Sequence, residues 1–236
     1  MGKKGIGKTY QTTLMMKEYA KGGNGVKPRR VLILDVNDEF EEFRSMRVKD
    51  VEIFNVHPRI EIRRIRPFKD DGTRMTLRDI ADTLYVILDK YRGGMLLIED
   101  INKYISDHLP NDLVGAICTN RHTNTDLIMH FQSIGRITSK IWQNLNWLRF
   151  HKNSDSVKRH ENKFPDKIAL FSIVESMVNK RYYDGDTRFF LYIDVDEEKI
   201  YGEYDEELFN YAVDEYCSIN HRQVVKPYIN KRNDKG

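Results

Sequence analysis

An eight-residue glycine motif near the start of the chain constrains its fold more than any other feature. Residues 2–9 read G-K-K-G-I-G-K-T and match the spacing G-x-x-x-x-G-K-[ST]. Glycines at these places let backbone N–H groups turn towards a phosphate, and the helix that follows adds its positive dipole end. The lysine of such a loop, here Lys8, reaches the β- and γ-phosphates, and the hydroxyl of Thr9 binds Mg²⁺.

The motif therefore predicts a nucleoside triphosphate site whose ligands are ATP and Mg²⁺. A glycine-rich turn that merely precedes a helix is the alternative interpretation. Under the first interpretation, the residues expected to contact the nucleotide are Gly2, Lys3, Lys4, Gly5, Ile6, Gly7, Lys8, Thr9 and Tyr10.

A pair of acids follows an apolar run farther along the chain. The run 95–98 is typical of a buried parallel strand, and it ends in Glu99 and Asp100. The carboxyl end of such a strand lies at the edge of the sheet where a phosphate loop is held. Mg²⁺ needs oxygen ligands and hydrolysis needs a base. We therefore assign Glu99 to the metal and Asp100 to catalysis and leave the reverse assignment open. Two acids that only end a strand are the alternative.

The next expected strand, 126–131, ends at Gln132. A polar side chain at this position can contact the γ-phosphate and report its loss. Together with Lys8 and Glu99, Gln132 completes a set of side chains from three segments around one nucleotide.

Apolar strand-like stretches alternate with helical patterns, which predicts an α/β fold with a mostly parallel sheet flanked by helices. Thr76 and Asp79 mark the start of one helix with a relative of the capping box, and apolar residues follow at helical spacing. The other helices are expected at 9–21, 111–121, 155–162, 166–180 and 206–216. Strands are expected at 31–34, 51–56, 60–65, 95–98, 126–131 and 147–150, with a hairpin formed by 188–193 and 199–204.

A length of 236 residues fits one sizeable core with a small addition. We expect the core at 1–152 and a small α+β extension at 153–236, which comprises helices, a β-hairpin, a last helix and a basic tail. A phosphate loop must follow a strand, yet the motif begins at Gly2. We therefore expect the first strand of the core upstream of residue 1, unless an unusual start replaces it.

The composition is typical of soluble globular proteins, with 40% hydrophobic and 32% charged residues. No apolar run approaches the roughly 18 residues of a membrane span. The cysteines Cys118 and Cys217 have no metal-type spacing, and the N-terminus has no secretory pattern. These features predict a reduced, cytoplasmic setting.

The net charge of +3 is too small to indicate nucleic-acid binding by itself, so the distribution of charge matters more. Basic residues gather at 59–66, 152–163 and 221–235. Within the first group we select Arg63, Arg64 and Arg66 as candidate contacts to DNA phosphates, although alternate residues of a strand face opposite ways. Solvated faces and a frayed terminus are the alternative.

Two further segments carry a family resemblance. Residues 32–40, L-I-L-D-V-N-D-E-F, resemble the second-strand segment of the HerA/FtsK superfamily of DNA-pumping P-loop ATPases. Residues 121–132, R-H-T-N-T-D-L-I-M-H-F-Q, resemble its sensor strand, notably in the zonular-occludens-toxin-like branch. The resemblance spans about 2–150, whereas 151–236 match nothing recognisable. The order Glu-Asp at 99–100 reverses the usual order of the superfamily.

The resemblance implies a RecA/HerA-FtsK-like core and a homo-oligomeric ring, commonly a hexamer, with each nucleotide at a subunit boundary. A neighbouring subunit would insert an arginine to offset charge on the transferred phosphoryl group. Arg121 and Arg136 are the candidates because both flank the sensor strand, and a solvated surface arginine is the alternative for each.

The leading hypothesis is an ATPase that moves double-stranded DNA, of the compact type that viruses use to fill capsids. This hypothesis adds a capsid-vertex or portal-type docking partner. A nucleotide-gated scaffold with little turnover is the alternative from another class, and a cellular or plasmid DNA translocase is the alternative within the superfamily. A small-molecule kinase fits the segment 35–40 poorly.

Overall fold

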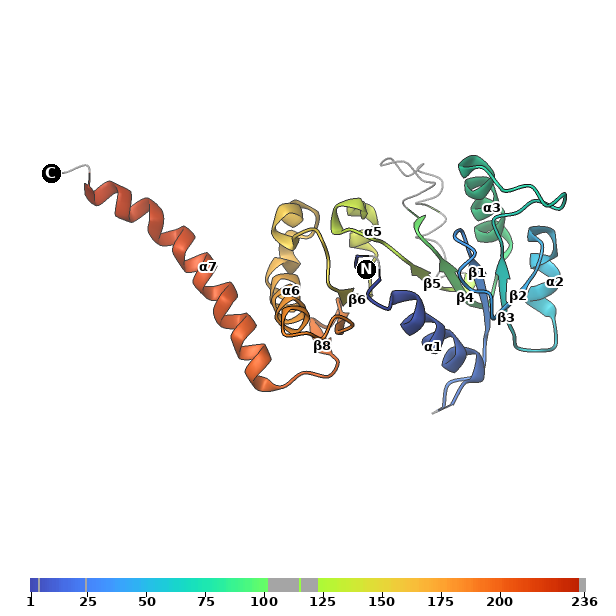
Figure 1. The fold of residues 1–236 in the computed structure, drawn as a ribbon, viewed down its shortest axis with the longest axis horizontal. Coiled ribbons are helices and arrows are strands. Elements are labelled where there is room, and N and C mark those ends of the chain that lie inside the picture. The colour runs from blue at the N-terminus through green and yellow to red at the C-terminus, as the bar shows by residue number, and fades with distance from the viewer. Residues whose placement is uncertain (4, 24, 102–114, 116–122, 234–236) are drawn as a thin grey trace. The chain divides into compact units, whose positions relative to one another are not determined.

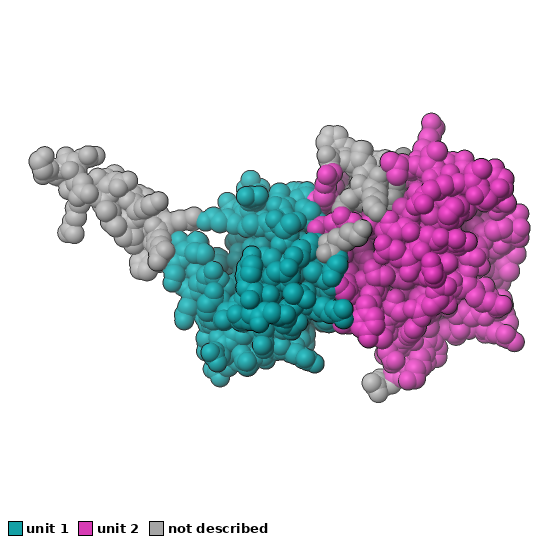
Figure 2. Space-filling view, viewed as in Figure 1, with its two compact units in different colours: residues 1–6, 133–135, 145–236 teal, residues 7–132, 136–144 magenta. Residues whose placement is uncertain are grey.

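The computed structural model describes residues 1–3, 5–23, 25–101, 115 and 123–233, with side chains as far as 219. Lys4, Arg121 and nearly all of the helix expected at 111–121 lie outside these residues. The chain forms two compact units, which Figure 2 colours separately. Unit 1 comprises Met1–Ile6, Ser133–Gly135 and Leu145–Gly236, and unit 2 comprises Gly7–Gln132 and Arg136–Asn144.

In the part of the chain that the structure describes, unit 2 contains a parallel sheet of five strands in the order β2-β3-β1-β4-β5 (Figure 1). Its strands are β1 (Arg30–Leu34), β2 (Arg44–Ser45), β3 (Ile62–Ile65), β4 (Gly94–Ile98) and β5 (Asp126–Met129). Strands β1 and β4 are adjacent, with Leu34 opposite Ile98. The segments that leave these two strands therefore emerge side by side at the carboxyl edge of the sheet.

Helices α1 (Lys8–Lys21), α2 (Val51–Val56) and α3 (Leu77–Lys90) lie beside this sheet in Figure 1. The described part of unit 2 contains two further short helical segments, α5 (Ser139–Gln143) and the 3₁₀ segment η1 (Val48–Asp50). Helix α1 contributes Met16 to a buried cluster with Val31, Ile33, Phe40, Met95 and Leu97. This cluster joins α1 to β1 and β4.

Helix α3 begins as its sequence predicts. The Thr76 hydroxyl accepts from the backbone N–H of Asp79, and the Asp79 carboxylate accepts from the backbone N–H of Thr76, which completes a capping box. Ile80, Leu84, Ile87 and Leu88 form the buried stripe of the helix. The helix ends at Lys90, three residues before Gly93.

The strand expected at 51–56 is wrong, because these residues form helix α2. Val51 and Phe54 are buried, whereas Ile53 and Val56 are 65% and 80% exposed. Burial at positions i and i+3 is the spacing of a short helix, and the high content of β-branched residues conceals it.

Among the described residues, unit 1 contains a three-stranded antiparallel sheet formed by β6 (Trp147–His151), β7 (Phe190–Asp194) and β8 (Lys199–Tyr201). The hairpin of β7 and β8 is confirmed. Strand β6 pairs with β7 instead of joining the parallel sheet, contrary to its expected place in the strand-helix alternation. Helices of unit 1 are η5 (Val157–Lys163), η6 (Pro165–Lys167), α6 (Ile168–Tyr183) and α7 (Glu206–Asn233), and η4 (Ile134–Arg136) spans the two units in sequence.

Helix α7 extends well beyond the expected end at 216. None of the helices in the described part of the chain is both long and apolar enough to cross a membrane.

Candidate nucleotide site

The second half of the glycine motif forms the beginning of helix α1. Gly7 caps the helix with φ 83°, in the left-handed region that favours glycine, and Lys8 and Thr9 occupy the first turn. No side chain caps this helix, and its first turn contains no acid. Backbone N–H groups at such a helix start attract an anion.

The first half of the motif belongs to unit 1. The N-terminal amine of Met1 donates to the carbonyl of Arg149 at 2.6 Å, and the backbone N–H of Lys3 donates to the carbonyl of Lys152 at 2.9 Å. The Lys3 ammonium group donates to the Tyr182 hydroxyl at 2.5 Å. Residues 1–3 are thus held along strand β6.

The loop after β1, residues 35–40, is fixed by a buried carboxylate. Asp35 is fully buried and accepts from the backbone N–H groups of Glu39 at 2.9 Å and Phe40 at 3.1 Å. Arg64 lies in β3 and donates to the same carboxylate at 2.8 Å. These bonds hold the loop at the carboxyl edge of the sheet.

Asp100 connects three segments of this edge. Its Oδ2 atom accepts from the Asn37 amide at 3.0 Å and from the Gln132 amide at 2.9 Å. Asn37 follows β1, Asp100 follows β4 and Gln132 follows β5. Asp100 has φ 42°, a conformation that residues other than glycine rarely adopt. Backbone strain at such a position is typical of functional sites.

Glu99 is buried in a cluster of acids. Its side chain is 3% exposed, and burial together with the negative charges of Glu39, Asp35 and Asp100 raises its pKa to about 8. Glu39 is exposed, and its Oε2 atom lies 3.5 Å from the hydroxyl of Thr9, which is placed to donate to it. Carboxylates therefore lie next to the threonine of the glycine motif.

Helix α1 is also joined to the end of β5. The Thr12 hydroxyl and the His130 Nε2 atom lie 2.8 Å apart, and both side chains are buried. This contact fixes the start of α1 against the segment that leads to Gln132.

The structure thus brings together Thr9, Glu99, Asp100 and Gln132, all in unit 2. Lys8 lies beside Thr9 in the first turn of α1, and Tyr10 is 60% exposed in the same turn. Arg136 is exposed in η4, and its expected role as an arginine finger stays a prediction.

Asn37, Glu39, Thr12 and His130 also belong to this constellation, although they were not expected as site residues. For Asn37 and Glu39 the signal was present in the sequence, since polar residues follow an apolar strand just as they do at 99–100. The pairing of Thr12 with His130 had no such signal.

The expected surface position of Arg64 is wrong. Arg64 is 7% exposed and forms ion pairs with Asp35 at 2.8 Å and Asp38 at 2.7 Å. Strand β3 lies between β2 and β1, so one of its faces is covered. The Arg64 guanidinium group therefore binds carboxylates of the loop after β1 instead of facing solvent. Arg66 holds Asp38 with two hydrogen bonds of 2.8 and 2.7 Å, which lower the pKa of that carboxyl.

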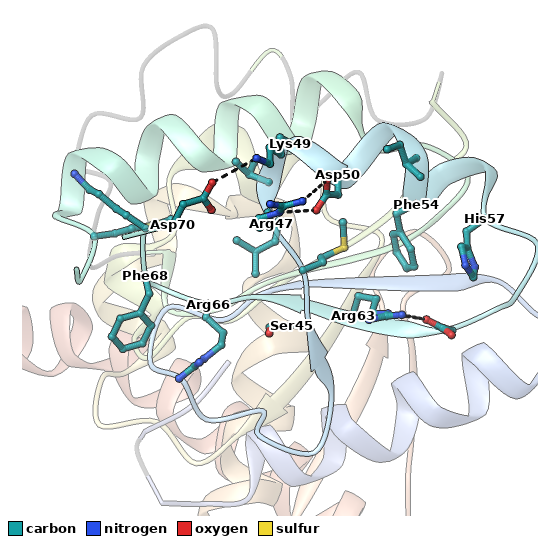
Figure 3. A pocket seen from close by; sticks show the side chains of 17 residues that line it. Ser45, Arg47, Lys49, Asp50, Phe54, His57, Arg63, Arg66, Phe68 and Asp70 are labelled. Carbon is teal, nitrogen blue, oxygen red and sulfur yellow. Dashed lines mark hydrogen bonds and ion pairs between the residues drawn. The ribbon is translucent and has the colours of Figure 1, made fainter. Parts of the chain in front are cut away.

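Arg63 and Arg66 line a pocket of about 660 Å³ at the carboxyl ends of β2 and β3. Figure 3 shows that its rim contains the ion pairs Arg47–Asp50, Lys49–Asp70 and Arg63–Glu61. Each of these three cations, Arg47, Lys49 and Arg63, is therefore already paired with a carboxylate. DNA binding by Arg63 and Arg66 stays a prediction.

A parallel sheet flanked by helices, with a glycine motif at the start of α1, defines the α/β fold of the P-loop NTPases. The chain is similar in structure to the genome packaging NTPase B204 from Sulfolobus turreted icosahedral virus 2 in complex with AMPPCP. The TM-score is 0.54 at 16% sequence identity, and the match covers 85% of this chain and 92% of that chain.

The DNA-packaging ATPase B204 from Sulfolobus turreted icosahedral virus is similar as well, with a TM-score of 0.55 at 13% identity over 86% of this chain and 95% of that chain. A further structure of the virus 2 protein contains ATP-gammaS and has a TM-score of 0.53 at 15% identity over 85% of this chain and 92% of that chain. No protein-family model and no curated protein matches the sequence. At these identities the similarity establishes the fold.

Proposed function

We propose that this chain is a Mg²⁺-dependent ATPase that moves double-stranded DNA, most closely of the viral genome-packaging type. The observation that carries the proposal is the set of contacts around the start of α1. Thr9 lies beside Glu39, burial and the charge of Glu39 raise the pKa of Glu99, and Asp100 accepts from Gln132. A glycine-rich turn with no ligand would not need acids and amides from three strand ends around it.

The phosphate groups of ATP would lie against the first turn of α1. The positive dipole end of α1, which no side chain caps, and the Lys8 ammonium group supply positive charge for the β- and γ-phosphates. Gly2, Lys3, Lys4, Gly5, Ile6, Gly7 and Tyr10 complete the proposed nucleotide contacts.

The side chains at this edge fit Mg²⁺. The Thr9 hydroxyl and the carboxylates of Glu39 and Glu99 are hard oxygen ligands, and a cation would offset the burial and the repulsion that together raise the pKa of Glu99. No group of three or more His, Cys, Asp or Glu residues in the described part of the chain is arranged to hold a metal alone. Proteins usually bind Mg²⁺ through few side chains together with the phosphates of a nucleotide.

When bound with ATP, Mg²⁺ offsets the charge that develops on the transferred phosphoryl group. Glu99 holds the metal side of the site in this proposal. Asp100 accepts a proton from the attacking water, and two amide donors orient its carboxylate. Gln132 reports the loss of the γ-phosphate through its bond to Asp100.

These roles separate in two isosteric variants. Glu99→Gln should weaken Mg²⁺-dependent binding of ATP, whereas Asp100→Asn should bind ATP normally and hydrolyse it about 100 times more slowly. Calorimetric titration with Mg²⁺-ATP and single-turnover hydrolysis measure the two effects. If Asp100→Asn loses binding and Glu99→Gln loses only turnover, the two roles are exchanged.

The packaging function is supported by the similarity to two proteins that are described as packaging enzymes. We assign the chain to the HerA/FtsK superfamily on the segments 32–40 and 121–132. The proposal includes a homo-oligomeric ring, an arginine from a neighbouring subunit, a capsid-vertex or portal-type docking partner and a setting in the host cytoplasm. A domain boundary at 152 belongs to the same proposal.

Duplex DNA tests this part of the proposal. ATP turnover should rise on addition of duplex DNA, independent of its sequence, and the apparent affinity for DNA should fall steeply between low and physiological salt. If DNA never changes turnover in the assembled protein while ATP is still hydrolysed, the chain is a nucleotide-dependent protein without a DNA track.

A nucleotide-gated scaffold remains the second candidate. The order of Glu99 and Asp100, which reverses the usual order of the superfamily, favours it. Tight binding of Mg²⁺-ATP without measurable turnover would support it.

A further inference from the structure

The three residues that follow Gln132 are held by one carboxylate within unit 1. The Oδ2 atom of Asp155 accepts from the Ser133 hydroxyl at 2.9 Å and from the backbone N–H of Gly135 at 3.0 Å. It also lies 2.7 Å from the Nε2 atom of His160. We refer to Ser133, Gly135, Asp155 and His160 as the Asp155 clasp.

Further contacts restrict the same residues. The Lys163 ammonium group donates to the carbonyl of Gly135 at 2.6 Å. A Cβ atom at Gly135 would lie 2.9 Å from the Asp155 Oδ2 atom and 2.8 Å from the His160 ring, so no larger residue fits without opening the clasp. The Ser133 hydroxyl and both the N–H and the C=O group of Gly135 are therefore held by hydrogen bonds.

The geometry of the clasp excludes a nucleophilic role for Ser133. In a serine hydrolase the histidine receives the proton of the serine, and the acid lies on the far side of the histidine. Here serine and histidine approach the same oxygen of Asp155. Burial raises the pKa of Asp155, but the bonds from Ser133, Gly135 and His160 outweigh it and hold this pKa below the usual value. The Asp155 carboxylate is therefore a charged acceptor that binds the loop at 133–135.

The loop that it binds is joined directly to the proposed γ-phosphate sensor. Gln132 donates to Asp100 at 2.9 Å, and the next residue in the chain is Ser133. A displacement of Ser133 changes where the peptide can place Gln132, and small displacements of positioning groups cause large losses of rate.

We propose that Asp155 is a positioning residue for Gln132 and acts through Ser133 and Gly135. This inference rests on the proposed function. It predicts that the clasp affects hydrolysis, which depends on the amide of Gln132, and leaves ATP binding at the start of α1 unchanged.

A double-mutant cycle tests the inference. Asp155→Ala should lower the single-turnover rate of ATP hydrolysis about 10- to 100-fold and leave the dissociation constant of Mg²⁺-ATP within about twofold. In a Gln132→Ala background, Asp155→Ala should lower the rate little further, because its effect passes through the missing side chain. Asp155→Asn, which keeps an acceptor oxygen, should recover most of the rate.

Val157→Ala is the matched control. Val157 is 1% exposed in the segment that follows Asp155 and takes no part in the clasp. This variant should lose stability through a cavity but keep the rate of hydrolysis. Gly135→Ala, in contrast, should lower the rate as Asp155→Ala does.

Additive effects of Asp155→Ala and Gln132→Ala would overturn the inference, and so would an equal loss of rate in Val157→Ala. Both outcomes require a wild-type protein that hydrolyses ATP. If the wild-type protein binds Mg²⁺-ATP but does not hydrolyse it, the proposed function fails, and the inference fails with it for that separate reason.

Discussion

At the scale of single residues, the candidate site is a balance of charges. Glu99 is nearly excluded from solvent and lies among other carboxylates, whereas Asp100 is stabilised by two amide donors. Glu99 and Asp100 are adjacent in the sequence and yet have opposite environments. Such a separation is how proteins give two carboxylates different roles.

Glu99 makes the stability of the nucleotide-free protein depend on pH. Its pKa is raised to about 8 in the folded state from about 4.5 in the unfolded state, so the folded state binds the additional proton between these values. The free energy of unfolding should therefore fall as pH rises from 5 to 8. The contribution is on the order of a few kcal/mol.

Urea denaturation of wild type and Glu99→Gln at pH 6 and pH 8.5 measures this effect. The variant cannot ionise, so its loss of stability between the two pH values should be smaller than that of the wild type. Equal losses would show that Glu99 is ionised throughout.

At the scale of elements, the loop after β1 is the main link between the sheet and the site. Asp35 and Asp38 are held by Arg64 of β3 and by Arg66, which follows β3, and the same loop presents Asn37. These two arginines therefore hold the loop that contributes to the site.

Removal of the two arginines should have unequal consequences. Arg64→Ala leaves the fully buried Asp35 without its cation and should lower the free energy of unfolding by about 3–5 kcal/mol. The Arg66 side chain is 42% exposed, so Arg66→Ala should cost no more than about 1 kcal/mol. Chemical denaturation compares the two variants. Equal and small losses would contradict the buried position of Arg64.

The capping box of α3 offers a separate test of an element. Thr76→Ala removes the acceptor for the Asp79 N–H and should destabilise the protein by about 1 kcal/mol. Asp82→Ala, an exposed change on the same helix, should stay within about 0.5 kcal/mol in the same denaturation assay. A loss in Asp82→Ala as large as that in Thr76→Ala would argue against the cap.

Local patterns were sufficient for α1, α3, β1, β4 and β5, because glycines flank α1, a capping signal opens α3 and apolar runs mark the strands. They failed at α2, whose β-branched residues suit a strand as well as a short helix. They could not show that β6 leaves the parallel sheet, since pairing is decided by contacts with β7 far along the chain. The same limit hid Arg64 and the Asp155 clasp, whose partners are distant in sequence.

At the scale of the whole molecule, the chain combines a P-loop NTPase fold with an antiparallel unit that contains the start of the glycine motif and the loop after Gln132. Both ends of the proposed nucleotide chemistry therefore continue into unit 1 through the backbone. The unit that ends in α7 is therefore covalently joined to the proposed nucleotide site.

The most direct test of the account is the rate of ATP hydrolysis by wild type and Lys8→Ala under saturating Mg²⁺-ATP. In the proposed site Lys8 supplies the cation for the β- and γ-phosphates, so its loss should abolish turnover to below about 1% of the wild-type rate. Circular dichroism and urea denaturation of both proteins confirm that the fold is intact. Near-normal hydrolysis by folded Lys8→Ala would contradict the assignment of residues 2–9 as the nucleotide site.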